Sequence, residues 1–144
     1  RITRADIDAV ASRAVESRVF DMCDELAANH TGRALAMLAD LETSREPAVA
    51  VTAVIARQFR QLYAARLSLE AGRDRASIMQ LTGIRFPYHA NRLIDSARRI
   101  PLPLLRYALM ACMEADAELK SSRAADYDTV RMLIMRYAAK AAET

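Results

Sequence analysis

Hydrophobic residues recur along most of the chain with the period of about 3.6 residues that an α-helix requires. Residues 87–99 illustrate this, since Ala90, Leu93, Ile94 and Ala97 stand at positions i, i+3, i+4 and i+7. No segment shows the alternation of a half-buried strand. The pattern predicts an all-α protein, a single helical bundle domain of seven to eight helices with one long central helix.

The first part of the pattern predicts three short helices. Thr3 and Asp6 have the spacing of a capping box, which indicates that a helix starts there and runs to near Glu16. Its apolar residues are expected to face inward, namely Ile7, Val10 and Ala14. Ser17 is the expected cap of a second helix, and Thr31 the expected start of a third. The latter two helices should form an antiparallel hairpin.

The central helix is predicted to follow the segment SREPAVAV. Ser44 is its expected cap, and Pro47 suits a first turn because the missing proline N–H costs nothing there. No breaker occurs before Gly72, so the helix can extend for about 24 residues. Its apolar residues occupy more than one stripe, which favours burial on several sides.

The second half of the chain is divided by glycine and proline. A short helix from Arg75 is closed by Gly83, and Pro87 opens the next. The segment IPLPLL predicts an extended break before an apolar helix over 104–119. The last helix is expected to start at Asp126 or Asp128.

Composition restricts the possible functions. The chain is 53% hydrophobic and 27% charged, with 3 Gly, 4 Pro and 2 Cys among 144 residues. No apolar run approaches the ~20 residues of a membrane span. Because it begins without methionine, we expect the chain to be a piece of a longer protein. Cys23 and Cys112 are expected to be reduced, buried thiols.

No catalytic constellation is apparent in the sequence. The two histidines, His30 and His89, are far apart, and three scattered glycines cannot form a phosphate-binding loop. Asp21, Asp24 and Glu25 lack the further ligands that a metal site requires. We therefore expect neither an enzyme active site nor a cofactor.

Arginines are concentrated in residues 73–106, which contain seven Arg and two Asp. This charge suggests an alternative function, a DNA-binding helical module with a helix-turn-helix-like pair at 75–99. Its second helix would offer exposed residues to base edges and phosphates, namely His89, Asn91, Arg92, Ser96 and Arg99. Against this, the turn after Gly83 is long, and Phe86 cannot cap the helix through its side chain.

The last two predicted helices carry more apolar surface than a small bundle usually buries. Several of the 7 methionines lie in them. Core packing is the simpler explanation, but the surplus favours an interface with another subunit.

Several segments, taken in order, resemble a known family. They are ITRADIDAVASRAVESRVFDMCDEL, GRALAMLADL, EPAVAVTAVIARQFRQLY, GIRFPYHANRLIDSAR and EADAELKSS. Together they are similar to the C-terminal (collar) region of the delta subunit of the bacterial DNA polymerase III clamp loader. The match is loosest at SRAADYDTV.

The resemblance implies a non-catalytic subunit-assembly domain that supports sliding-clamp loading in DNA replication. Residues 1–14 would be the tail of the preceding AAA+ lid module or a linker helix, and 15–144 the helical collar. The partners would be delta prime and gamma/tau, and the sliding clamp would be contacted only through the missing N-terminal module. Any DNA contact would be indirect, and no membrane would be involved. The complete protein would be cytoplasmic and would belong to the DNA polymerase III holoenzyme.

The resemblance also implies structural or interface roles for eight residues. Phe59 and Tyr63 would anchor the central helix, while Arg57 and Arg60 would reach neighbouring helices or subunits. The other four candidates comprise two residues of the short helix pair and one ion pair, namely Tyr88, Arg98, Asp116 and Lys120. The spacing of Asp116 and Lys120 favours an ion pair within one helix.

Overall fold

The computed structural model describes residues 2–144, apart from the side chains of residues 8, 11 and 12. The described residues form seven α-helices and no strand, so the all-α prediction is confirmed. The helices are α1 (Arg4–Ala27), α2 (Thr31–Thr43), α3 (Ala48–Glu70), α4 (Arg75–Thr82), α5 (Pro87–Arg99), α6 (Leu102–Ser121) and α7 (Tyr127–Ala142).

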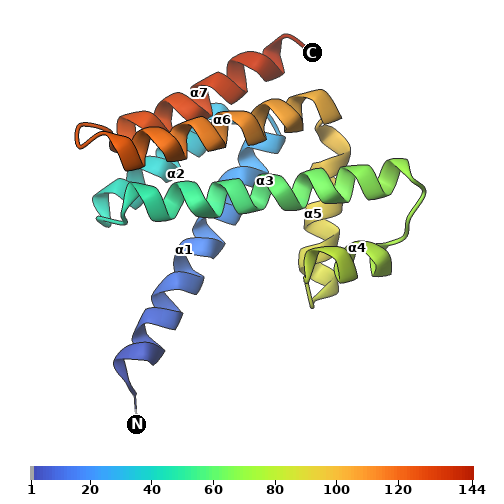
Figure 1. Ribbon diagram of the computed structural model, residues 1–144. Helices are drawn as coiled ribbons and strands as arrows, with labels where there is room; N and C mark the ends of the chain where they lie inside the picture. Colours follow the sequence, from blue (N-terminus) through green and yellow to red (C-terminus); the bar gives the residue numbers. More distant parts are fainter. Residues whose placement is uncertain (1) are drawn as a thin grey trace.

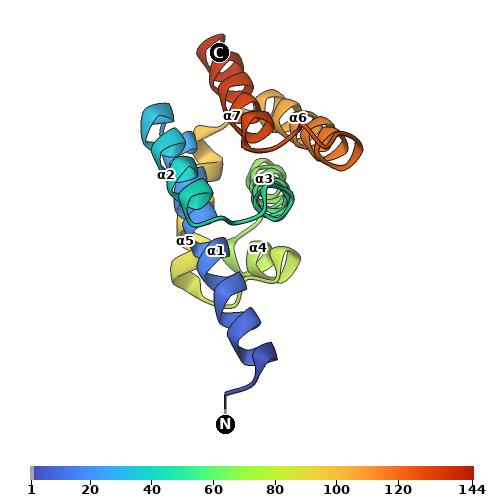
Figure 2. The same cartoon turned by 90° about the vertical axis from the view of Figure 1, so that its left-hand side faces the viewer.

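The long helix α3 is the centre of the bundle, as predicted. It contacts α1, α4, α5, α6 and α7. Viewed nearly along its axis, α3 runs between α1, α2 and α5 on one side and α6 and α7 on the other (Figure 2). Val51, Ile55, Phe59 and Leu62 are all buried, whereas Leu67 is exposed. Burial on several sides explains why the apolar residues of this helix do not form a single stripe.

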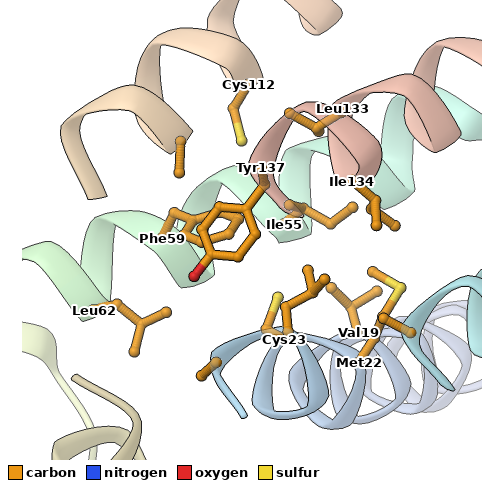
Figure 3. Packing of buried hydrophobic residues seen from close by; sticks show 14 of the residues in the cluster. Val19, Met22, Cys23, Ile55, Phe59, Leu62, Cys112, Leu133, Ile134 and Tyr137 are labelled. Carbon is orange, nitrogen blue, oxygen red and sulfur yellow. The ribbon is translucent and has the colours of Figure 1, made fainter. Parts of the chain in front are cut away.

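At the centre of the core, side chains from α1, α3, α6 and α7 meet around Phe59 (Figure 3). The helix α1 contributes Val19, Met22 and Cys23, and α7 contributes Leu133, Ile134 and Tyr137. Cys112 enters from α6. Both cysteines are free and buried, as expected from their apolar surroundings.

The N-terminal segment differs from the prediction. The capping box at Thr3 is present, with Asp6 N–H donating to Thr3 Oγ1 at 3.2 Å and Thr3 N–H donating to Asp6 Oδ2 at 2.9 Å. The helix does not end near Glu16, however, and Ser17 caps nothing, because no glycine or proline interrupts residues 4–27. The first turns of α1 project beyond the other helices (Figure 1), leaving exposed the residues predicted to face inward, Ile7, Val10 and Ala14.

Two further helix boundaries differ from the prediction. Ser44 follows α2 rather than capping α3, and its N–H donates to the Asp40 carbonyl at 3.0 Å. Pro47 is the residue that precedes α3. The predicted extended break before α6 is shorter than expected, because Pro103 lies in the first turn of the helix, where a missing N–H is tolerated.

The α4–α5 pair forms as predicted. Asp74 Oδ1 accepts from Ser77 N–H at 2.9 Å, and Gly83 ends α4 with a φ of 77°, a conformation that favours glycine. Pro87 starts α5, whose buried face contains Ala90, Leu93 and Ala97.

Candidate functional site

The described residues contain no group of three or more His, Cys, Asp or Glu side chains placed to hold a metal ion. His30 contacts Glu25 through Nδ1 at 2.7 Å. His89 lies elsewhere, on α5, with its ring 6.3 Å from that of Phe20. The two histidines therefore do not share a site.

The arginine-rich helix α5 is held against α1 by polar contacts of Arg92 and Ser96. Arg92 Nε donates to Asp24 Oδ2 and its Nη2 to Asp21 Oδ1, each at 3.0 Å, and its guanidinium lies 4.7 Å from the centre of the Phe20 ring. Burial opposes the charge, but these hydrogen bonds outweigh it and raise the pKa of Arg92. Ser96 Oγ donates to Asp24 Oδ1 at 2.9 Å.

This contact corrects part of the DNA-binding hypothesis. Arg92 and Ser96 were expected to be exposed on the second helix, but Ser96 is buried and Arg92 is paired with α1. His89, Asn91 and Arg99 remain exposed. Asp21 and Asp24, considered from the sequence only as metal ligands, instead anchor α5 to α1.

The eight candidate residues lie on three helices, α3, α5 and α6. On α3, Phe59 is buried and Tyr63 is half-buried against the core. Both arginines are exposed, but Arg57 Nη2 pairs with Glu16 Oε1 at 3.0 Å and links α3 to α1, whereas Arg60 has no ion pair among the described residues. Arg57 and Arg60 therefore make different contacts although they are one turn apart.

The candidates on α5 and α6 lie at the surface. Tyr88 is exposed beside His89, with ring centres 5.6 Å apart. Arg98 is also exposed, and its Nη1 lies 3.8 Å from Asp95 Oδ1. On α6, Lys120 Nζ donates to Asp116 Oδ2 at 2.8 Å, which confirms the predicted pair. Asp116 and Lys120 line a groove together with Arg60, whereas Tyr88 and Arg98 do not line it.

An exposed apolar surface lies on the last two helices. Met110 and Met113 on α6 are 47% and 73% exposed, and Met132 and Met135 on α7 are 59% and 49% exposed. Such side chains cover irregular apolar partners well because they are flexible. Their exposure supports the interface interpretation of this apolar surplus more than the core-packing one.

Several contacts between distant segments had no signal in the sequence. Arg66 Nη1 donates to the Arg98 carbonyl at 2.9 Å and so binds the end of α5. Tyr127 Oη donates to the Glu46 carbonyl at 2.7 Å, joining α7 to the loop before α3. Arg131 Nη1 contacts Glu42 Oε1 at 2.7 Å across 89 positions. Spacing along a helix cannot reveal such pairs.

Comparison with known proteins identifies the family. The model of the family "DNA polymerase III delta subunit, C-terminal domain" matches residues 16–137. The chain belongs to this family. The residues matched by the delta C-terminal domain run from the second half of α1 into α7. They include nearly all of the core and the contact of Arg92 with α1.

The fold is also similar to that of a solved structure, the Bacillus subtilis DNA clamp loader delta protein. The two superpose with a TM-score of 0.79 at 20% sequence identity. The superposition covers 95% of this chain but only 40% of that structure, so this delta C-terminal domain spans about two fifths of the related protein. Comparison with curated proteins finds no match. Among the described helices none is long and apolar enough to cross a membrane.

Proposed function

We propose that this chain is the collar domain of a clamp-loader delta subunit and that it joins the subunit to its neighbours without catalysing a reaction. The observation that carries the proposal is the family match over residues 16–137. The exposed methionines of α6 and α7 support it, because a lone domain gains nothing from leaving large apolar side chains in water.

The parent protein, in this proposal, is a cytoplasmic subunit of the DNA polymerase III holoenzyme. Its collar would contact delta prime and gamma/tau. The sliding clamp would be reached only through a preceding module, and any role of DNA would be indirect. Neither a cofactor nor a metal ion is required for such an assembly role.

We further propose that residues 1–14 connect the collar to the preceding AAA+ lid module. The projecting first turns of α1 support this division, since Ile7 and Val10 are each 58% exposed and contribute nothing to the core of the bundle. Because α1 is continuous through residue 14, the connection would be a helix rather than a flexible linker.

The eight candidate residues take two roles in this proposal. Phe59, Tyr63 and the Arg57–Glu16 pair would hold α3 and α1 in place. Four exposed candidates and the half-buried Asp116 would be available to other subunits, the exposed ones being Arg60, Tyr88, Arg98 and Lys120.

Light scattering during size-exclusion chromatography tests the proposal. This domain is mixed with the collar regions of delta prime and gamma/tau, and the mass of each peak is measured. A mixed complex of defined mass is the expected result. Elution of every component at its own mass, at concentrations well above micromolar, would contradict an assembly role carried by this domain.

A further inference from the structure

A groove of about 390 Å³ lies between α3 and α6. Its walls are mainly apolar and include Ala53 and Ala56 from α3 and Leu109 and Met113 from α6. Arg60 lines it as well, and so do Asp116 and Lys120.

Small side chains make this groove suited to close approach of another helix. Val49, Ala53, Ala56 and Arg60 follow one another at helical spacing on α3, and Ala53 is exposed. The alanines give a shallow channel between the larger side chains, into which a ridge of another helix can pack. Apolar surface extends past the groove through Val49, which is 39% exposed, and through Met110.

The charges along the groove are not balanced. Asp116 and Lys120 neutralise each other at 2.8 Å. Arg60 makes neither an ion pair nor a side-chain hydrogen bond among the described residues, whereas Arg57, one turn before it, pairs with Glu16. An unpaired guanidinium beside an apolar channel favours a partner that brings a carboxylate, because Arg binds carboxylates with two parallel hydrogen bonds.

The groove wall also contains a polar atom without a partner. Thr52 lines the groove and is fully buried, and its Oγ1 has no hydrogen-bond partner within residues 2–144. Buried hydroxyls are nearly always hydrogen-bonded in folded proteins. Thr52 is an exception to this rule, and because its Oγ1 has no accessible surface the hydroxyl itself is not a contact point for a partner in the groove.

We propose that the groove between α3 and α6 receives a helix of a neighbouring clamp-loader subunit. That helix presents a ridge of apolar side chains to Ala53, Ala56 and Met113 and places a carboxylate against Arg60. The inference rests on the proposed assembly function and adds to it the surface that is used and the chemistry of the partner. The Asp116–Lys120 pair lies at the rim of the same groove, which gives this candidate pair a place in the interface.

The first test fills the groove in the complete delta subunit. Ala53→Trp places a large side chain in the channel, and Ala36→Trp, at an exposed alanine of α2, is the matched control. Each variant is titrated with delta prime and gamma/tau, and complex formation is followed by light scattering. Ala53→Trp is expected to weaken assembly at least about tenfold, the effect of losing one central contact, while Ala36→Trp assembles like the unmodified subunit.

The second test reverses the charge of Arg60. It therefore does not depend on whether the fold accepts a tryptophan in the groove. Arg60→Glu is compared with Arg73→Glu, since both arginines are exposed. Arg60→Glu is expected to weaken assembly at least about tenfold, because two carboxylates would then face each other. Arg73→Glu is expected to leave it unchanged. Thermal unfolding of each variant confirms that the fold is intact.

The outcomes separate this inference from the proposed function. Normal assembly of both Ala53→Trp and Arg60→Glu, with an unmodified subunit that assembles, overturns the groove inference and leaves the collar function standing. Equal losses in Arg60→Glu and Arg73→Glu overturn it too, because general charge would then be the cause. Failure of the unmodified subunit to assemble contradicts the proposed function itself.

Discussion

The Phe59 ring on α3 packs against the Tyr137 ring on α7, with ring centres 5.2 Å apart and planes inclined by 44°. The two residues are far apart in the domain sequence, and both are 2% exposed. Tilted aromatic pairs of this kind add specific attraction to their hydrophobic burial. The contact places α7 on the central helix.

We expect Phe59→Ala to lower the free energy of unfolding by ~3–5 kcal/mol, because it empties the centre of the core. Chemical denaturation followed by far-UV circular dichroism measures this change. Phe86→Ala is the matched control, since Phe86 is 63% exposed and its loss should cost less than about 0.5 kcal/mol. Similar losses for the two variants would contradict the placement of Phe59.

The contact between α5 and α1 should depend on Arg92. Arg92→Met keeps most of the side-chain stem but removes the hydrogen bonds to Asp21 and Asp24, so we expect a loss of ~1–3 kcal/mol. Arg98→Met is the control, because its exposed pair with Asp95 should be worth less than about 0.5 kcal/mol. Combining Arg92→Met with Asp24→Asn should give a smaller loss than the sum of the two. Strict additivity would count against the pairing.

The cap of α4 should make stability depend on pH in the acid range. The Ser77 N–H donates to Asp74 and lowers the pKa of this carboxyl below its ordinary value. A carboxylate whose pKa is lower in the folded state stabilises the protein above its unfolded pKa. That stabilisation is lost as the pH falls from about 4 through the lowered folded value. The difference in thermal midpoint between the wild type and Asp74→Asn, which caps but does not titrate, should therefore shrink between pH 7 and about pH 2. A constant difference would refute this origin.

Both thiols should be inert in the native protein. Burial raises the pKa of Cys112 to about 12 and also raises that of Cys23, so neither is a thiolate near neutral pH. We expect a maleimide at about pH 8 to label them only as fast as the protein unfolds, and to label both at once in denaturant. Because the folded pKa values are raised, stability should also fall as the pH rises from about 9 toward 12. Rapid labelling of one thiol in the native state would contradict this burial.

The sequence predicted the parts of the fold that depend on local chemistry. Gly83 ends α4 because it adopts a left-handed conformation, and Pro87 begins α5 because proline suits a first turn. The absence of breakers before Gly72 likewise predicted the long helix α3. The same reasoning failed at Ser17, because a serine that is able to cap a helix is also tolerated inside one.

The candidate site was predicted less well because it depends on contacts between helices. The Asp116–Lys120 pair was predictable, since both residues lie on one helix. The pairing of Arg92 with Asp21 and Asp24 crosses about 70 positions, and periodicity carries no information on which helix faces which. For the same reason the unpaired Arg60 and the buried Thr52 hydroxyl could not be distinguished from their neighbours in the sequence.

Removing this domain from the complete delta protein is the decisive test of the assembly role. The full delta subunit and a version that lacks residues 15–144 are each mixed with delta prime and gamma/tau, and the affinity for the complex is measured by light scattering across a dilution series. We expect the shortened subunit to fail to join the complex at concentrations where the full subunit assembles completely. Equal affinity of the two forms would contradict an assembly role for this domain.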